Sequence, residues 1–170
     1  MSGVWNCRLI RAIILPLLLL LSGPANADPE IAIGDSIALG LKEAGHLAGG
    51  AVVGAGPRAV AHMVGSYPTD LFKQAVVILS CGASNDTTQL GYCKEDVHYL
   101  TSLGAYVILL GVGDVIPKSQ QVNDILLSYT NDYPNTLFVH GWFEVHPPSY
   151  PALLRFIREH ECISWRICQV

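Results

Sequence analysis

The chain has little positive charge, and this limits its partners. Its 170 residues include ten Lys+Arg against fourteen Asp+Glu, which gives a formal net charge of −4. A protein that binds the phosphates of nucleic acids or an anionic lipid surface needs positive charge to attract them. We therefore expect neither nucleic acid nor an anionic membrane surface as a main partner.

Long apolar runs are missing after the first 27 residues. Residues 1–27 have the pattern of an export signal, because Arg8 and Arg11 precede a short apolar run and Ala25-Asn26-Ala27 offers small residues for cleavage. That run is shorter than the roughly 20 residues of a membrane-spanning helix. We expect a signal peptide at 1–27 and one mature domain at 28–170. Since two of the ten basic residues leave with the signal, the mature domain has a formal charge of −6. We expect it to be secreted or periplasmic, without stable membrane insertion.

The cysteines lack the spacing of a zinc site. Cys7 lies in the expected signal, which leaves Cys81, Cys93, Cys162 and Cys168. An even number of cysteines in an exported chain indicates disulfides, and four cysteines allow three connectivities. Proximity along the chain favours Cys81–Cys93 and Cys162–Cys168. We expect these two disulfides, no metal and no organic cofactor.

Apolar runs of strand length alternate with helical segments along the mature chain. Consecutive apolar residues are typical of strands that are covered on both faces, as in a parallel sheet between helices. They predict strands at residues 31–33, 51–53, 75–79, 106–110 and 137–139. The intervening segments predict helices at 36–46, 58–64, 89–103, 120–129 and 150–160. This order predicts an α/β fold, a three-layer α/β/α sandwich with a five-stranded, mainly parallel sheet of flavodoxin-like type. Alternating Ile163, Trp165 and Ile167 predict a further short strand.

One serine occupies a position where a weak nucleophile can be activated. Ser36 follows Gly34 and Asp35 at the junction of a predicted strand and a predicted helix. Unpaired N–H groups at a helix start favour a developing anion beside such a serine. The alternative interpretation is that Ser36 is only the N-cap of its helix.

Two other polar residues follow predicted strands, and ligand sites of such sheets lie beyond the carboxyl ends of the strands. His146 precedes Pro147 and Pro148, and its imidazole could accept the serine proton, although a histidine in this setting is most often a loop residue. The amide of Asn85 could donate to an oxyanion. Turn chemistry explains Asn85 equally well, because its neighbours also favour loops.

Three segments together resemble the blocks of the SGNH hydrolase superfamily, the GDSL-type esterases and lipases. Gly34-Asp35-Ser36 resembles the first block, Gly82-Ala83-Ser84-Asn85-Asp86 the third, and Val145-His146-Pro147 the last. The resemblance implies an SGNH-type fold with Ser36 as nucleophile, His146 as base and Asn85 as an oxyanion donor. It also implies a second-block glycine whose N–H joins the oxyanion hole, for which the chain offers Gly54 or Gly56.

The chain departs from the family pattern at the residue that orients the base. The family's aspartate stands three residues before the histidine, where this chain has Phe143. Glu144 is the nearest carboxylate and the candidate third member. Otherwise a backbone carbonyl or a water orients the imidazole, which gives a Ser–His dyad. In the third block, one extra residue separates Gly82 from Asn85.

Two further features carry weaker signals. Gly111-Val112-Gly113-Asp114 follows a predicted strand but lacks the Lys-Ser/Thr of a phosphate loop, and Asp114 could line a cleft. His140 shows no ligand spacing, and a structural or surface role is favoured.

These residues predict an exported serine esterase that hydrolyses short acyl esters, in particular acetyl esters, through an acyl-enzyme. No insertion is large enough for a lid, which favours a small acyl group on a bulky alcohol such as a polysaccharide or an envelope glycan. The alternative is a catalytically weak or inactive binding module of the same fold, which Phe143 and the stretched Asn85 loop favour. The expected partner is a small-molecule or glycan ester, and the sequence predicts no oligomeric state.

Overall fold

The computed structural model describes residues 29–81, 87–142 and 144–165, without the side chains of 161–165. The expected signal peptide, Asn85 and Phe143 lie outside the described residues. So does the expected Cys162–Cys168 pairing.

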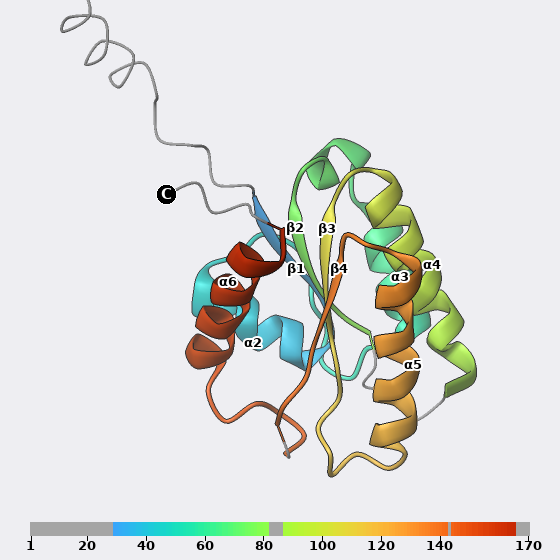
Figure 1. Ribbon diagram of the computed structural model, residues 1–170, viewed down its shortest axis with the longest axis vertical. Coiled ribbons are helices and arrows are strands. Elements are labelled where there is room, and N and C mark those ends of the chain that lie inside the picture. The colour runs from blue at the N-terminus through green and yellow to red at the C-terminus, as the bar shows by residue number, and fades with distance from the viewer. Residues whose placement is uncertain (1–28, 82–86, 143, 166–170) are drawn as a thin grey trace, which may run out of the picture.

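A parallel sheet of four strands forms the centre of the fold (Figure 1). The strands lie in the order β1-β2-β3-β4, and every neighbouring pair is parallel. Their bounds are β1 Glu30–Gly34, β2 Val76–Ser80, β3 Tyr106–Leu110 and β4 Thr136–Val139. All five residues of β2 are buried, as expected for a strand whose two faces are both covered.

The strand expected at 51–53 does not form as a regular strand. The chain instead runs beside the outer edge of β1 slightly earlier, through two isolated parallel bridges that pair Ala48 with Ile31 and Ala51 with Gly34. Gly49 lies between them with a φ of 104°, and a Cβ there would lie 2.2 Å from a carbonyl oxygen of β1. Glycine weakens regular pairing while allowing this close approach, so the prediction of five regular strands is wrong by one.

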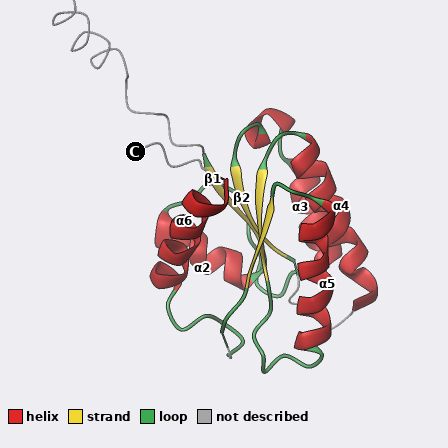
Figure 2. Cartoon of the chain, in the orientation of Figure 1, coloured by secondary structure: helices red, strands yellow, loops and turns green. Residues whose placement is uncertain are grey.

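Helices cover both faces of the sheet (Figure 2). One face carries α2 (Ser36–Gly45) and α6 (Tyr150–Trp165), and the other carries α3 (Pro57–Ser66), α4 (Leu90–Ser102) and α5 (Ser119–Asp132). Short 3₁₀ turns occur at Thr69–Phe72 and Thr87–Gln89. Because side chains alternate along a strand, Ile31 and Ile33 enter one apolar core and Ala32 the other. The predicted three-layer α/β/α sandwich is confirmed.

The last helix is longer than expected. The sequence predicts an end near residue 160, but α6 continues to Trp165, so the strand expected from Ile163 onward is wrong over its described part. No Gly or Pro interrupts the chain after Pro151, and helix propagation is favourable once a helix has started. None of the described helices has the length and apolar character needed to cross a membrane.

The disulfide Cys81–Cys93 is confirmed. It joins the residue after β2 to the first turns of α4, with a Cα–Cα separation of 6.0 Å. Both cysteines are fully buried. The bridge therefore fixes both flanks of the segment that contains Asn85.

Candidate active site

Ser36 and His146 form a hydrogen bond across 110 residues of sequence. The Oγ of Ser36 lies 2.8 Å from the Nε2 of His146. Ser36 is the first residue of α2, directly beyond β1, and His146 lies in the loop that connects β4 to α6. Both side chains therefore lie beyond the carboxyl ends of parallel strands, where ligand sites of this architecture occur.

The N-cap of α2 is Asp35 and not Ser36. The Oδ1 of Asp35 accepts a hydrogen bond of 2.9 Å from the backbone N–H of Ile37. The hydroxyl of Ser36 is therefore not used as a cap and remains available to His146. The alternative interpretation of Ser36 as the N-cap is wrong.

Asp35 itself is buried and anchored to the end of β2. The hydroxyl of Ser80 donates a 2.7 Å hydrogen bond to the same Oδ1, and no solvent reaches the Asp35 side chain. Its other oxygen, Oδ2, is buried without a partner among the described residues. Burial raises the pKa of Asp35, although the hydrogen bonds from Ser80 and Ile37 act in the opposite direction.

The backbone before the serine is tightly constrained. Gly34 has a φ of 148°, and a Cβ there would lie 2.1 Å from the carbonyl oxygen of Ser80. The N–H of Asp35 donates to that same carbonyl oxygen at 3.2 Å. Only glycine allows this approach, which sets the direction in which Ser36 leaves the sheet.

Tyr150 supports the serine from α6, and the sequence interpretation missed it. Its hydroxyl donates to the backbone carbonyl of Ser36 at 3.4 Å, and its ring centroid lies 6.5 Å from that of His146. Burial raises the pKa of Tyr150, so it remains a neutral donor at neutral pH. One sequence feature could have indicated this contact: Gly40 is a glycine inside an expected helix, which often marks close packing. A Cβ at Gly40 would lie 2.2 Å from the Tyr150 ring.

The other predicted site residues are not joined to this pair. Glu144 is exposed, and within the described ranges no hydrogen bond or ion pair connects it to His146. Gly56 is the N-cap of α3 with extended backbone at φ −86°, and none of the described hydrogen bonds links it to Ser36. Asn85 falls outside the described residues, so the oxyanion donors stay predictions. Among the described residues, no group of three or more His, Cys, Asp or Glu side chains could hold a metal ion.

The fold is similar to that of a known acyltransferase domain. It matches the C-terminal catalytic domain of Streptococcus pneumoniae peptidoglycan O-acetyltransferase A, solved with a methylsulfonyl adduct, with a TM-score of 0.54. The match covers 82% of this chain and 93% of that chain at 15% sequence identity. At this identity the likeness shows the fold alone, and the SGNH-type fold implied by the sequence is confirmed. No protein-family model and no curated protein sequence matches this chain.

Proposed function

We propose that this chain, whose fold is of the SGNH type, is an exported enzyme that acts on acyl esters, with Ser36 as nucleophile and His146 as base. The observation that carries the proposal is the 2.8 Å hydrogen bond between Ser36 Oγ and His146 Nε2. A nucleophile and a base within about 2.6–3.2 Å are the signature of covalent catalysis by a hydroxyl group.

The reaction proceeds in two halves. Ser36 Oγ bonds to the acyl carbon while His146 Nε2 takes the hydroxyl proton. The resulting oxyanion is stabilised by the backbone N–H of Ser36 at the start of α2, with Asn85 and Gly56 as further donors. His146 then gives its proton to the departing alcohol, which leaves an acyl group on Ser36. In the second half, the oxygen of water in hydrolysis, or of a sugar hydroxyl in transfer, bonds to the acyl carbon while His146 takes its proton. His146 then returns the proton to Ser36 Oγ as the acyl–serine bond breaks.

We assign the proton transfer to the Ser36–His146 pair alone. The carboxylate of Glu144 is exposed and makes no described contact with the imidazole. A backbone carbonyl or a water then orients the ring, as in a Ser–His dyad. Tyr150 holds the carbonyl of Ser36 in place, and Asp35 holds its helix start.

The proposed substrate is a short acyl ester, in particular an acetyl ester, on an envelope glycan. The similar domain belongs to a peptidoglycan O-acetyltransferase, whose activity joins an acetyl group to a glycan. Here the pattern of residues 1–27 and the Cys81–Cys93 disulfide support an exported location. We propose that this chain hydrolyses the ester. Transfer of the acyl group to a sugar hydroxyl is the alternative reaction of the same acyl-enzyme.

The test is turnover of 4-nitrophenyl acetate by the purified chain, followed as release of 4-nitrophenolate. Ser36→Ala should abolish turnover while the far-UV circular dichroism spectrum is unchanged. Ser128→Ala is the matched control, because Ser128 is an exposed serine on α5 whose hydroxyl bonds only within its own helix. Undiminished turnover in Ser36→Ala would contradict the mechanism.

A second candidate function is a binding module that keeps this fold without turnover. The absence of a described carboxylate contact on His146 favours it, together with Phe143 at the position of the family's aspartate. Such a module would bind a glycan but would not turn over the aryl acetate at any pH.

A further inference from the structure

A histidine–carboxylate pair lies at the same edge of the sheet as Ser36 and His146. Asp114 lies in the loop after β3, and His140 is the residue directly after β4. His140 Nε2 is 3.1 Å from Asp114 Oδ1. The proposed mechanism uses neither residue.

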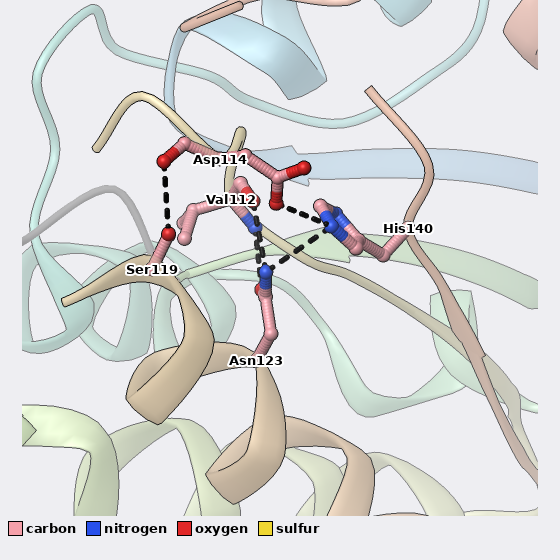
Figure 3. A network of polar contacts seen from close by, with 5 residues as sticks. All are labelled: Val112, Asp114, Ser119, Asn123 and His140. Atoms are coloured by element: carbon pink, nitrogen blue, oxygen red, sulfur yellow. Dashed lines mark hydrogen bonds and ion pairs between the residues drawn. The ribbon is translucent and has the colours of Figure 1, made fainter. Parts of the chain in front are cut away.

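Asn123, a buried residue of α5, fixes the backbone of Val112 beside the pair (Figure 3). The side-chain oxygen of Asn123 accepts from the backbone N–H of Val112 at 2.8 Å, and its Nδ2 donates to the Val112 carbonyl at 3.0 Å. The same Nδ2 lies 3.4 Å from His140 Nε2. Ser119 Oγ donates to the backbone carbonyl of Asp114 at 3.1 Å. The backbone around Asp114 is therefore fixed from α5.

His140 is also held by aromatic neighbours, whereas Asp114 faces outward. The ring of His140 lies 6.3 Å from that of Phe138 and 5.4 Å from that of Trp142. Its side chain is 23% exposed, against 55% for Asp114. The outer oxygen of Asp114 has no partner among the described residues. His140 thus holds one carboxylate oxygen and leaves the other as an acceptor for a bound molecule.

The pair and Ser36 follow strands of the same parallel sheet. Strand β2 separates β1 from β3, so two interstrand spacings, about 10 Å, lie between the ends of the strands that carry Ser36 and Asp114. The Asp114 N–H also donates to the Trp142 carbonyl at 3.3 Å, which ties Asp114 to the loop that carries His146. An extended substrate of linked sugar rings can span this distance.

A pocket of about 240 Å³ adjoins His140. It is lined by His140 and Trp142, by Pro147 and Ser149 of the loop that follows His146, and by Phe156 of α6, whereas Asp114 is not part of its lining. The lining thus extends from the loop that contains His146 to His140, the residue that bonds Asp114. Carbon-rich walls with a few polar groups suit a ring that has an apolar face and hydroxyls at its edge.

We propose that Asp114, positioned by His140, is a substrate-binding carboxylate that accepts hydrogen bonds from hydroxyls of the glycan chain that carries the ester. The pocket beside His140 holds another ring of that chain. This inference rests on the proposed function and specifies the alcohol side of its substrate. A carboxylate favours hydroxyl donors and repels anionic groups, so the sugar is uncharged where it meets Asp114.

The test compares two esters that differ in their hydroxyl groups. The probes are a 6-O-acetylated chitotriose and 4-nitrophenyl acetate, which has no sugar hydroxyls. For the trisaccharide, Asp114→Asn should raise KM by about tenfold or more, because a charge-assisted hydrogen bond is weakened, while kcat stays within about twofold. Both constants for the aryl acetate should stay within about twofold. His140→Gln should also raise the KM for the trisaccharide, by a smaller factor than Asp114→Asn does.

Asp124→Asn is the matched control, because Asp124 is an exposed acid on α5 next to Asn123. It should leave every constant unchanged. A merely structural role for Asp114 would alter the kinetics of both esters together, and that result would overturn the inference. An unchanged trisaccharide KM in Asp114→Asn would also overturn it.

A binding measurement separates this inference from the proposed function. Calorimetric titration with unmodified chitotriose needs no ester cleavage, and Asp114→Asn should weaken the binding by about tenfold. If the chain turns over no ester but binds chitotriose more weakly as Asp114→Asn, the carboxylate site is supported and the esterase function is rejected. If the chain turns over esters but Asp114→Asn leaves its affinity for chitotriose unchanged, the esterase function stands and the carboxylate site is rejected.

Discussion

The hydroxyl of Ser80 donates a 2.7 Å hydrogen bond to Asp35, and this contact ties the end of β2 to the turn that presents Ser36. The same carboxylate oxygen caps α2 through the N–H of Ile37. One buried carboxylate thus positions the serine relative to the sheet and to its helix, while the serine hydroxyl stays available to His146.

Asp35→Ala should therefore reduce stability. It removes an N-cap and leaves the buried Ser80 hydroxyl without its acceptor, which together should cost about 1–3 kcal/mol in the free energy of unfolding. Asp35→Asn keeps an acceptor oxygen and should cost less. Urea unfolding checks both variants, with Asp70→Ala as control, because Asp70 is an exposed acid that forms an ion pair with exposed Lys73. Equal stability of Asp35→Ala and wild type would contradict the anchoring role.

His146→Gln should reduce turnover without unfolding the chain. Removal of a general base typically lowers kcat by about 10²–10⁴-fold, and His146 is exposed, so its loss should change the melting temperature little. Initial rates on 4-nitrophenyl acetate measure the effect. His62→Gln, an exposed histidine on α3, serves as the control. A His146→Gln enzyme as fast as wild type would remove the base from the mechanism.

Glu144→Gln should leave kcat within about threefold of wild type, because the described structure shows no contact between Glu144 and the imidazole. Loss of a carboxylate that orients a catalytic histidine costs about 10⁴-fold. The same aryl acetate assay distinguishes the two cases. A fall of that size would make Glu144 the third catalytic residue.

Asp96 should make stability depend on pH. It is buried on α4, and burial, with a smaller effect from the Glu95 charge, raises its pKa to about 7. The folded state then holds the Asp96 proton at pH values where the unfolded state has lost it. Stability therefore falls as pH rises from about 4 to 7, and for this group it levels off above pH 7.

Asp96→Asn should remove this dependence. Between pH 5 and pH 8, wild type should lose about 2–3 kcal/mol more in unfolding free energy than the variant does. Urea unfolding at the two pH values measures the difference. Asp124→Asn, which removes an exposed charge, should behave as wild type. If the unfolding free energy of Asp96→Asn changed with pH as much as that of wild type, a group other than Asp96 would cause the pH dependence.

Most of the fold could be predicted because its regular strands are buried on both faces. The apolar runs at 31–33, 75–79, 106–110 and 137–139 all lie within observed strands or overlap them closely. Of the segment at 48–51 only Ala51 was predicted to pair, because the segment pairs through glycine-rich backbone and not through an apolar run. The apolar but exposed Val52 and Val53 moved the predicted strand two to three residues too far along the chain.

The residues of the candidate site that follow strands could be predicted from the sequence. Roles that depend on tertiary contacts were predicted less well. Asp35 and Ser36 are both good N-caps by propensity, and the contact with Ser80 is what distinguishes them. The Asp114–His140 pair joins residues 26 positions apart that follow two different strands, so no local spacing indicated it.

The most direct test of the central claim is peptide mass spectrometry of the chain after treatment with a fluorophosphonate probe. A covalent adduct requires a serine whose hydroxyl is activated by a neighbouring base. We predict one adduct on the peptide that contains Ser36, and its loss in both Ser36→Ala and His146→Gln. An unlabelled wild-type chain, or an adduct that persists in Ser36→Ala, would contradict the account.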